Sequence, residues 1–526
     1  MATAGTPQPA LRSVDLLVVG AGPVGLALAL QAQQYGANVA VVERRSRLAR
    51  PSRAMLLWTR TAQALDRLGV AEELAALPGA PTGTTVHLGD RHLQVPLAAL
   101  GRRGRRPPLV VRQADVEAVA RSAAVTRGVP VLDRTELTDL VLDGAGAVAT
   151  LSTPDVTWQT KCRFVVGCDG AESTVRRLAG ISWRGHTYPQ ETVLADVEMD
   201  DLTPSVAHIG AGRAGIGFLF PAGEHGAVWR LVLTRASRGS TTPPGRDGPA
   251  LPVPELREAM SGANLPGRIS AAPWSTRVRL QHRHAGTYRS GPIFLAGDAA
   301  HVFSPAGAQG MNTGLQDATN LGWKLAAVLN GSIDPRALQA SYEAERRPVA
   351  RQVGLLTDLL LHFEAGEQLL PRWTRTALLP ALAPAVPAVL KIRAASAPIG
   401  WVLSQEWVRY RGALTAHRRS LSRWGAGRFA PAAHVTIDGR RVALHEVTAR
   451  PGVHVLHGRA FPVAQLSGLP GVRLHSIDGW PVEQVAVVRP DGYIGYFDRA
   501  GDPASLLAWL QVVTGYAADQ HHGCTE

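Results

Sequence analysis

Residues 297–325, with the sequence GDAAHVFSPAGAQGMNTGLQDATNLGWKL, decide the fold of this chain. They follow the apolar run 292–296, which predicts a buried strand. Asp298 then stands at the expected carboxyl end of that strand, where open α/β folds bind ligands, and its carboxylate can accept hydrogen bonds from a sugar-like chain. The next loop has little side-chain bulk, so backbone N–H groups can approach a flat ligand. Its smallest or most restricted residues are Pro305, Gly307 and Gly310.

The second half of this stretch predicts a helix. Asn312 or Thr313 can cap its amino end, and apolar residues recur at helical spacing from 315 to 325. The positive end of the helix would then point back at the loop. These features predict a ligand that is planar, carries a sugar-like chain and gains negative charge at one edge. A reduced flavin has all three properties.

A dinucleotide-binding motif lies near the amino end of the chain. The apolar run 14–19 predicts a strand, the GxGxxG motif at 20–25 follows it, and an apolar helix extends to Gly36. Glu43 ends the next strand, at the spacing of an acid that binds a ribose hydroxyl. The motif predicts that a pyrophosphate lies against the amino end of the helix. The predicted cofactor-binding residues here are Gly20, Gly22, Pro23, Val24, Gly25 and Glu43.

Two further motifs differ in what they predict. A second GxGxxG at 210–215 is followed by strand-like residues, so it predicts a turn between strands and not a second nucleotide site. A nicotinamide cofactor would therefore have no domain of its own. The segment FVVGCDGAESTVR at 164–176 predicts a strand, a tight turn at Asp169 and a helix that begins at Ser173. Asp169 can border a ligand or hold only the turn.

The composition is that of a globular protein. The chain has 526 residues, which is enough for two or three domains. Of these residues, 45% are hydrophobic and 18% are charged. Its net charge is 55 − 42 = +13, but the Arg are spread along the chain, which favours a solvated surface over a nucleic-acid face. Three Cys form no CxxC pair, and no His/Cys set has metal-site spacing, so no metal is predicted. Without a signal pattern or an unbroken apolar span, we expect a cytoplasmic protein with no membrane partner.

The three motifs resemble those of the class A flavoprotein monooxygenases, the p-hydroxybenzoate hydroxylase-like group, and the longer pattern is similar to its aromatic polyketide hydroxylase branch. The resemblance implies an α/β fold with a GR2-type Rossmann-like FAD-binding domain, a β-sheet substrate domain and a thioredoxin-like carboxyl-terminal domain. The implied FAD-binding domain takes residues 1–183, with a β insert at 80–100 that joins the substrate domain, and 286–427 with a helical linker. The substrate domain takes 184–285 and the thioredoxin-like domain 428–526. The last has no CxxC, so packing or dimer contact is its expected role.

The resemblance also assigns roles to single residues. It places Arg53, and with it Arg44, near the flavin or the nicotinamide phosphates, and it places Gln113 against the flavin side chain. Arg53, with two residues of the 305–310 loop, Pro305 and Gly307, is a candidate for catalysis. The other motifs add as cofactor-binding residues Asp169, Gly297, Asp298, Pro305, Gly307, Gln309, Gly310, Met311 and Asn312.

The β-rich segment 184–284 supplies candidate walls of an apolar substrate pocket. These are the aromatic residues Phe218, Phe220, Trp229 and Trp274, each of which can instead be plain core. His301 is either an acid or base, or a structural neighbour of Asp298. Trp58 stands where the family more often has a smaller or polar residue, so it can shape the pocket.

Together these features imply a monooxygenase that uses FAD, O2 and NAD(P)H, with NADPH favoured. It would insert one oxygen atom, through a flavin C4a-(hydro)peroxide, into a polycyclic aromatic polyketide, most simply by hydroxylation in antibiotic or secondary-metabolite biosynthesis. Baeyer–Villiger insertion or oxidative ring rearrangement at the same flavin site is an alternative, and so is an FAD reductase that transfers no oxygen. A flavin-binding scaffold without turnover also stays open. The expected partner is the small aromatic substrate, with no nucleic acid, and the chain is expected to be a monomer or a homodimer.

Overall fold

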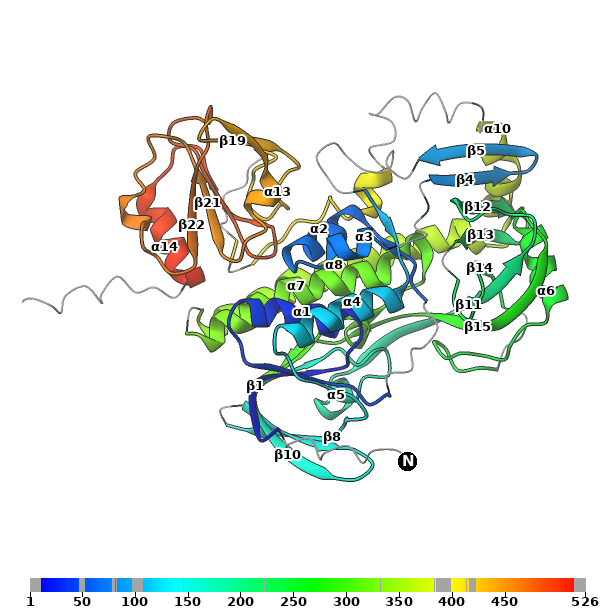
Figure 1. The fold of residues 1–526 in the computed structure, drawn as a ribbon, viewed down its shortest axis with the longest axis horizontal. Helices are drawn as coiled ribbons and strands as arrows, with labels where there is room; N and C mark the ends of the chain where they lie inside the picture. Colours follow the sequence, from blue (N-terminus) through cyan, green and yellow to red (C-terminus); the bar gives the residue numbers. More distant parts are fainter. Residues whose placement is uncertain are drawn as a thin grey trace, which may run out of the picture.

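The computed structural model describes residues 11–514, apart from 47–52, 78–80, 82, 97–106, 145, 222, 238, 240, 332, 383, 385–398, 413 and 416–421. Figure 1 shows three parts in a row. A parallel sheet with its helices lies in the middle, a large antiparallel sheet lies at one end, and a small β/α unit from the carboxyl-terminal part of the chain lies at the other. The predicted α/β class is confirmed.

The middle of the central sheet is built from short apolar runs: the last residues of β1 and β10, and all of β2 and β17. Its order is β16-β17-β10-β1-β2-β7, and β17, β10, β1, β2 and β7 run parallel. Such strands are buried on both faces, which explains why they are apolar without alternation. The hairpin β8–β9 extends the sheet from β10. The bounds are β1 (Ser13–Val19), β2 (Val39–Val42), β7 (Val131–Leu132), β8 (Glu136–Asp143), β9 (Gly146–Ser152), β10 (Thr157–Gly167), β16 (Arg289–Ser290) and β17 (Ile293–Leu295).

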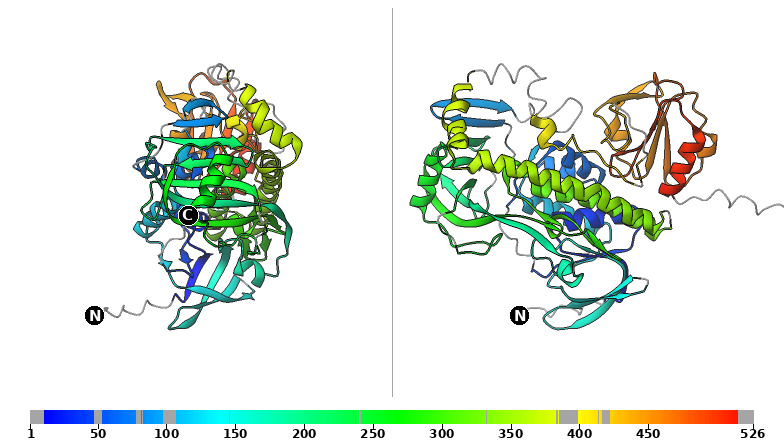
Figure 2. Two further views of the ribbon diagram at one scale, coloured as in Figure 1. Left: turned by 90° about the vertical axis from the view of Figure 1, so that its right-hand side faces the viewer. Right: turned by 180° about the vertical axis from the view of Figure 1, so that it is seen from behind.

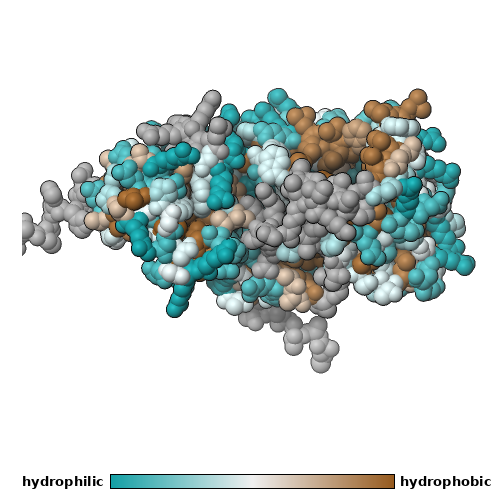
Figure 3. All heavy atoms as spheres, turned by 90° about the horizontal axis from the view of Figure 1, so that it is seen from above, coloured by the Kyte–Doolittle hydropathy of each residue, from teal (hydrophilic) through white to brown (hydrophobic). Residues whose placement is uncertain are grey.

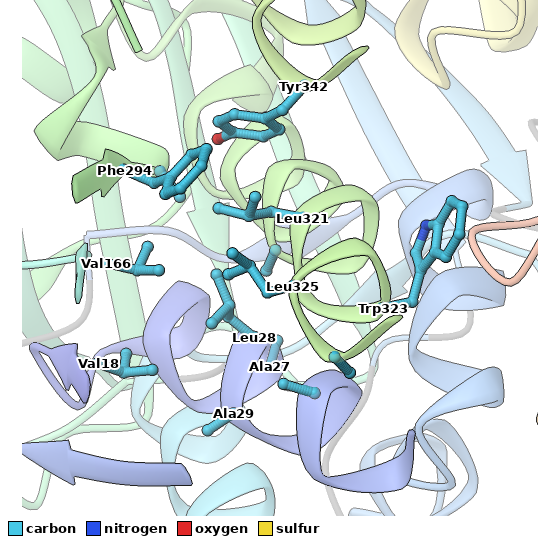
Figure 4. Close-up of a cluster of buried hydrophobic side chains, with 14 of the residues drawn as sticks. Val18, Ala27, Leu28, Ala29, Val166, Phe294, Leu321, Trp323, Leu325 and Tyr342 are labelled. Atoms are coloured by element: carbon cyan, nitrogen blue, oxygen red, sulfur yellow. The ribbon is translucent and has the colours of Figure 1, made fainter. Parts of the chain in front are cut away.

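Two helices pack on this sheet and on each other. Every residue from Gly25 to Ala32 of α1 (Pro23–Gln34) is buried, as expected of a helix that is apolar all round. A Cβ placed on Gly322 of α7 (Gln309–Leu329) would lie 2.8 Å from the Cβ of Gln31, so only glycine lets the two helices approach this closely. Figure 4 shows Leu28 of α1 against Leu321 and Leu325 of α7, with Phe294 and Tyr342 beside them. A third helix on this part of the fold is α4 (Gln113–Thr126).

The second large sheet has the order β18-β15-β11-β14-β13-β12-β4-β5. One face is covered by α6 (Val253–Gly262), a helix that the sequence did not predict, and its core includes Leu231, Leu256 and Leu265. The 210–215 motif is confirmed as the turn between β12 and β13. The bounds are β4 (Gly83–Leu88), β5 (Arg91–Pro96), β11 (Trp183–Met199), β12 (Val206–Gly212), β13 (Gly215–Phe220), β14 (Trp229–Ala236), β15 (Ile269–Ala285) and β18 (His301–Val302).

The long helix α8 (Pro335–Ala365) joins the parts. Figure 2 shows it running from the central sheet toward the antiparallel sheet, where it contacts β13 and β14. The carboxyl-terminal unit has the sheet β22-β21-β23-β24 with helix α14 (Pro503–Thr514) and a separate hairpin, β19–β20. Its bounds are β19 (His434–Ile437), β20 (Arg440–Ala443), β21 (Val453–His457), β22 (Val472–Ser476), β23 (Val485–Val488) and β24 (Ile494–Asp498). Its likeness to thioredoxin and the exact domain boundaries stay predictions.

Exposed apolar residues gather on α8 and on the following helix α9 (Leu369–Trp373). Leu355, Leu359 and Phe363 follow one another at four-residue spacing along α8, and Leu370 and Trp373 continue the apolar surface. Figure 3 shows apolar residues grouped on the upper face, in the half of the molecule away from the carboxyl-terminal unit.

The predicted oligomeric state stays a prediction. Among the helices of the described residues, none is both long and apolar enough to cross a membrane.

Candidate active site

The ends of four parallel strands meet at one edge of the central sheet. Val19 of β1 pairs with Val42 of β2 and with Gly167 of β10, and Gly167 pairs with Leu295 of β17. The residues that follow these ends belong to the predicted motifs: Gly20, Glu43, Asp169 and Asp298. Open α/β sheets bind ligands at this edge, so the register brings motifs from distant parts of the chain to one place.

The three predicted motifs, at 20–25, 164–176 and 297–312, are in direct contact with one another. A Cβ on Gly20 would lie 2.4 Å from the carbonyl oxygen of Cys168, so the first motif touches the third. A Cβ on Gly297 would lie 2.9 Å from Cγ2 of Val24, so the second motif touches the first. Arg176 of the third motif donates to the carbonyl of Ala299 at 2.9 Å. The three motifs therefore form one continuous site.

The amino end of α1 can receive a phosphate. Pro23 is its first residue, and Gly22 before it is extended and provides no side-chain cap. A Cβ on Gly25 would lie 2.0 Å from the carbonyl oxygen of Gly20, whereas a Cβ on Gly22 would meet nothing within 4 Å. Gly25 thus serves the tight turn, and Gly22 faces open space beside N–H groups that have no intrahelical acceptor.

Glu43 is held at the end of β2 by donors around it. Its carboxylate accepts from the N–H of Ala21 at 3.0 Å and from Nε of Arg45 at 2.7 Å. Burial alone would raise the pKa of Glu43, but the hydrogen bonds from Arg45 and Ala21 lower it below its usual value. Glu43 is therefore an ionised acceptor at the position expected for a ribose contact. Arg44 beside it is exposed.

Asp298 follows the end of β17 and is exposed at the ligand-binding edge of the sheet. The residue is solvent-exposed, yet burial by surrounding protein raises the pKa of its carboxyl, against the opposing effects of His301 and Arg53. His301 is buried, and its Nε2 lies 2.6 Å from Oδ2 of Asp317. The ring of His301 is therefore held by Asp317, which also accepts from the N–H of Gly297 at 3.1 Å, and not by Asp298.

The 305–312 loop differs from its prediction in one respect. α7 begins at Gln309, and the residue before it, Ala308, is in the left-handed conformation with φ 55° and gives no side-chain cap. Asn312 and Thr313 therefore lie inside the helix and do not cap it. The turn that leads into α7 can form because Gly307 has φ 69°, a left-handed conformation that glycine adopts without strain. The amino end of α7 is left without a side-chain cap, and a Cβ on Gly310 would meet nothing within 4 Å.

Side chains around this loop hold its shape. Trp58 donates from Nε1 to the carbonyl of Gly307 at 2.9 Å, and its N–H donates to Oδ1 of Asn312 at 2.8 Å. Gln309 is fully buried, donates to the carbonyls of Gly307 and Leu403, and accepts from Gln405. The side chains of Gln309 and Asn312, predicted to bind a cofactor, are thus occupied within the protein. Their backbone N–H groups stay at the amino end of α7.

Three other predicted residues also have partners within the chain. Arg53 donates to Oδ1 of Asp247 at 2.6 Å and to the carbonyl of Gly245 at 3.0 Å. Gln113 donates to Oε1 of Glu117 at 2.9 Å. Oδ2 of Asp169 accepts the N–H groups of two residues that open α5 (Thr174–Leu178), as its role in holding a turn requires.

The predicted aromatic residues divide between the two faces of the antiparallel sheet. The rings of Phe218 and Phe220 lie parallel, with centroids 6.1 Å apart, on the face opposite α6. Trp274 shares that face. It pairs across the strands with Asp196, Asp196 pairs with Arg230, and Arg230 pairs with Phe220, so all four residues point to the same side of the sheet. Trp229 is a correction: it is 1% exposed in the core beneath α6, because it stands one residue out of phase with this face.

The face of the sheet that carries Phe218, Phe220 and Trp274 adjoins the 305–310 loop. Leu280 lies on the same side of β15 as Trp274, and it packs with Ala306 of the loop and with Leu361 of α8. A planar group held by the loop would therefore lie close to the aromatic face of the sheet.

Comparison with known sequences decides the family. Residues 13–355 match the FAD binding domain family. The chain belongs to this family. The site fits FAD on its own geometry, because Gly22 and Gly310 leave open space beside two uncapped helix ends, and Glu43 and Asp298 offer acceptors for hydroxyl groups.

Named relatives narrow the class of enzyme. The chain is 34% identical over 353 residues to a 12-dehydrotetracycline 5-monooxygenase/anhydrotetracycline 6-monooxygenase of Streptomyces rimosus, covering 64% of this chain and 67% of the relative. It is 32% identical to a rifampicin monooxygenase of Streptomyces venezuelae, covering 64% and 69%. The solved structure of OxyS, an anhydrotetracycline hydroxylase from Streptomyces rimosus, matches with a TM-score of 0.75 and 26% identity, covering 96% and 100%. The protein is an FAD-dependent monooxygenase similar to the aromatic hydroxylases.

Sequence reasoning missed two groups of His and carboxylate residues in this monooxygenase. The first comprises Asp196, Glu224 and His225 on the aromatic face, and the second comprises His186, His282 and Asp358 between the sheet and α8. In each group the side-chain ligand atoms lie within 4.8 Å of one another. Asp196 reaches the adjacent Glu224 and His225 from a different strand, and the second group joins β11, β15 and α8, so no spacing pattern could reveal either group.

Proposed function

We propose that this monooxygenase hydroxylates a polycyclic aromatic polyketide, with NADPH as reductant. The observation that carries the proposal is the contact of the 305–310 loop with the aromatic face of the sheet, through Ala306 and Leu280. A flat substrate placed on Phe218, Phe220 and Trp274 would lie next to a flavin at this loop. The relatives named for anhydrotetracycline and rifampicin support a large polyketide substrate.

FAD, once reduced, supplies the activation of O2 from which one oxygen atom is transferred. The chain's part is to hold the reactants and control charge. The uncapped amino end of α7 favours negative charge on the reduced flavin. The bond from Trp58 to the carbonyl of Gly307 fixes the loop that borders the ring system. The aromatic side chains on this face of the sheet would help to keep water from the reacting atoms.

The reductant is proposed from charge and fold. Only one of the two GxGxxG motifs leads into a helix, so NADPH would bind transiently near the flavin and not in a domain of its own. Arg44 is exposed near the adenosine end of the FAD site, and the net charge of +13 favours a cofactor with an additional phosphate.

We propose hydroxylation ahead of Baeyer–Villiger insertion because of Arg53. Baeyer–Villiger chemistry requires a peroxide anion, which a free cation beside the flavin would stabilise. Arg53, the candidate catalytic cation, has its guanidinium paired with Asp247 at 2.6 Å. Its side chain is 40% exposed, and Asp247 already compensates its charge.

The test is to load the purified protein with FAD and supply NADPH or NADH, in air and without oxygen, with a panel of polycyclic phenols and quinones. We expect a product heavier by one oxygen atom with all rings intact, formed faster with NADPH and only in air. A product of the same added mass with an opened or expanded ring would replace hydroxylation by Baeyer–Villiger insertion. Substrate reduction without oxygen consumption would identify a reductase.

A further inference from the structure

The loop between β13 and β14 carries a histidine in an unusual backbone conformation. His225 has φ 58°, a left-handed value that few residues other than glycine adopt. The loop is tied to the FAD-binding part of the chain, because Arg112 donates to the carbonyl of Gly223 at 3.4 Å. Arg112 directly precedes Gln113, which the family resemblance places against the flavin. The loop that carries His225 therefore lies next to the amino end of α4.

A buried carboxylate fixes the imidazole. Nδ1 of His225 lies 2.6 Å from Oδ2 of Asp196, whose side chain is completely buried. An ionised carboxylate only accepts, so the hydrogen sits on Nδ1, and Nε2 is left as an acceptor. The ring of His225 lies nearly parallel to that of Trp274, at 15° with centroids 5.6 Å apart. The side chain is 39% exposed, so a ligand can reach it.

The charges around this pair are compensated within the protein. Arg230 donates to Oδ1 of Asp196 at 2.6 Å and to Oδ2 at 3.0 Å, and it lies 3.6 Å from Oε2 of Glu224. The charged groups near His225 are thus Asp196, Glu224 and Arg230, with Arg112 from the amino end of α4. Because a guanidinium bridges the two carboxylates, the group is built to orient a histidine and not to bind a metal cation.

The pair stands on the proposed substrate face. Asp196 pairs across the strands with Trp274 and with Arg230, and Arg230 pairs with Phe220. Directly opposed residues in neighbouring strands point to the same side of a sheet. A flat substrate on Phe220 and Trp274 would present its edge to His225.

We infer that His225 is the base that takes the proton from a phenolic hydroxyl of the substrate, and that Asp196 is its positioning residue. This inference rests on the proposed function. The O–H bond breaks, the proton moves to Nε2, and the electron pair stays on oxygen to form a phenolate. The phenolate raises the electron density of the ring carbons ortho and para to it, which are the atoms that an electrophilic oxygen attacks. Asp196 stabilises the imidazolium, which then loses its proton to water at its exposed edge.

The test follows the ionisation of a bound phenol in the FAD-loaded, oxidised enzyme. The probe is 1,8-dihydroxyanthraquinone, whose visible absorption changes when a hydroxyl ionises. We expect the wild-type enzyme to ionise the bound probe at a pH at least one unit below that of the free probe. His225→Gln should abolish this shift while it still binds FAD, and the exposed His186→Gln should leave it unchanged. Asp196→Asn should reduce the shift, because the carboxylate that fixes the tautomer is lost.

Either of two results with the probe would overturn the inference: a bound probe whose ionisation is the same in wild type and His225→Gln, or a wild-type enzyme that leaves the probe un-ionised or unbound. Failure of the proposed function looks different. In that case the wild-type enzyme would ionise bound phenols but transfer no oxygen to any of them. If oxygen transfer to phenols proceeds equally fast in wild type and in His225→Gln across the pH range, the proposed function stands and the inference about His225 fails.

Discussion

At the residue scale, glycine is needed at two positions of the first motif for different physical reasons. Gly25 is required by the protein itself, since any Cβ would overlap the carbonyl of Gly20 at 2.0 Å. Gly22 is extended and faces open space, so the protein alone would accept a side chain there. The second glycine is therefore kept for the ligand, whose pyrophosphate must come close to the backbone.

Gly22→Val tests this separation. We expect the apoprotein to fold with an unchanged melting temperature but to bind FAD at least tenfold more weakly, which is about 1.4 kcal/mol. Flavin fluorescence titration and thermal unfolding of the apoprotein measure the two effects. Gly25→Ala is the contrast, because it should lower the melting temperature even without FAD. Tight FAD binding by Gly22→Val would mean that the phosphates lie elsewhere.

At the element scale, α8 ends with a carboxyl group buried against the antiparallel sheet. Burial raises the pKa of Glu364 to about 7, although a hydrogen bond with Thr234 and the charge of Arg375 act to lower it. The folded protein therefore holds this proton above the pH at which the unfolded chain releases it. Stability from this group is complete at low pH and is lost as the pH rises from about 4.5 to about 7.

The expected outcome is that wild type loses up to about 3 kcal/mol of unfolding free energy over this window through Glu364, whereas Glu364→Gln does not. Urea unfolding at pH 5 and pH 8 measures the difference. Glu367→Gln, an exposed change three residues away, should behave as wild type does. An identical pH dependence in wild type and Glu364→Gln would show that the carboxyl is not buried in this way.

The elements also show what sequence could predict. Strand ends, the turn at Asp169 and the hairpin at 210–215 follow from local patterns, and the structure has them. The start of α7 was misplaced because the left-handed conformation of Ala308 depends on packing and leaves no signature in the sequence. The pairing of Asp196 with His225 was missed because it depends on the register of β11 and β14 and on a loop that folds back. The sequence left open whether Trp229 lines a pocket or belongs to the core, because the face that a strand residue occupies depends on the same register.

At the scale of the whole molecule, a buried charge network attaches the carboxyl-terminal unit. Arg489 of that unit donates to both oxygens of Glu345 in α8, at 2.6 and 2.8 Å, and also pairs with Asp491. Lys324 of α7 donates to Glu345 at 2.7 Å, and Asn320 bridges Glu345 and Asp491. The charges of two cations and two carboxylates thus compensate one another, and all four side chains are buried.

Removing one charged side chain of this network should leave its partner as an unpaired buried charge. We expect Arg489→Met to cost about 3–5 kcal/mol and to let proteases release the carboxyl-terminal unit. Differential scanning calorimetry and limited proteolysis measure both effects. The exposed Arg499→Met in the same unit is the control. If Arg489→Met melts and resists proteolysis as wild type does, then apolar contacts and not this network hold the unit.

The central claim, that this chain transfers one atom of O2 to an organic substrate at an FAD held by the three converging motifs, is tested most directly by isotope. FAD-loaded enzyme, NADPH and a polycyclic phenol that it consumes are mixed under ¹⁸O₂, and the product mass is measured. The account predicts a product that carries one ¹⁸O atom per molecule, and none when the label is supplied as water. A product whose new oxygen comes from water, or that gains no oxygen while the flavin turns over, would contradict it.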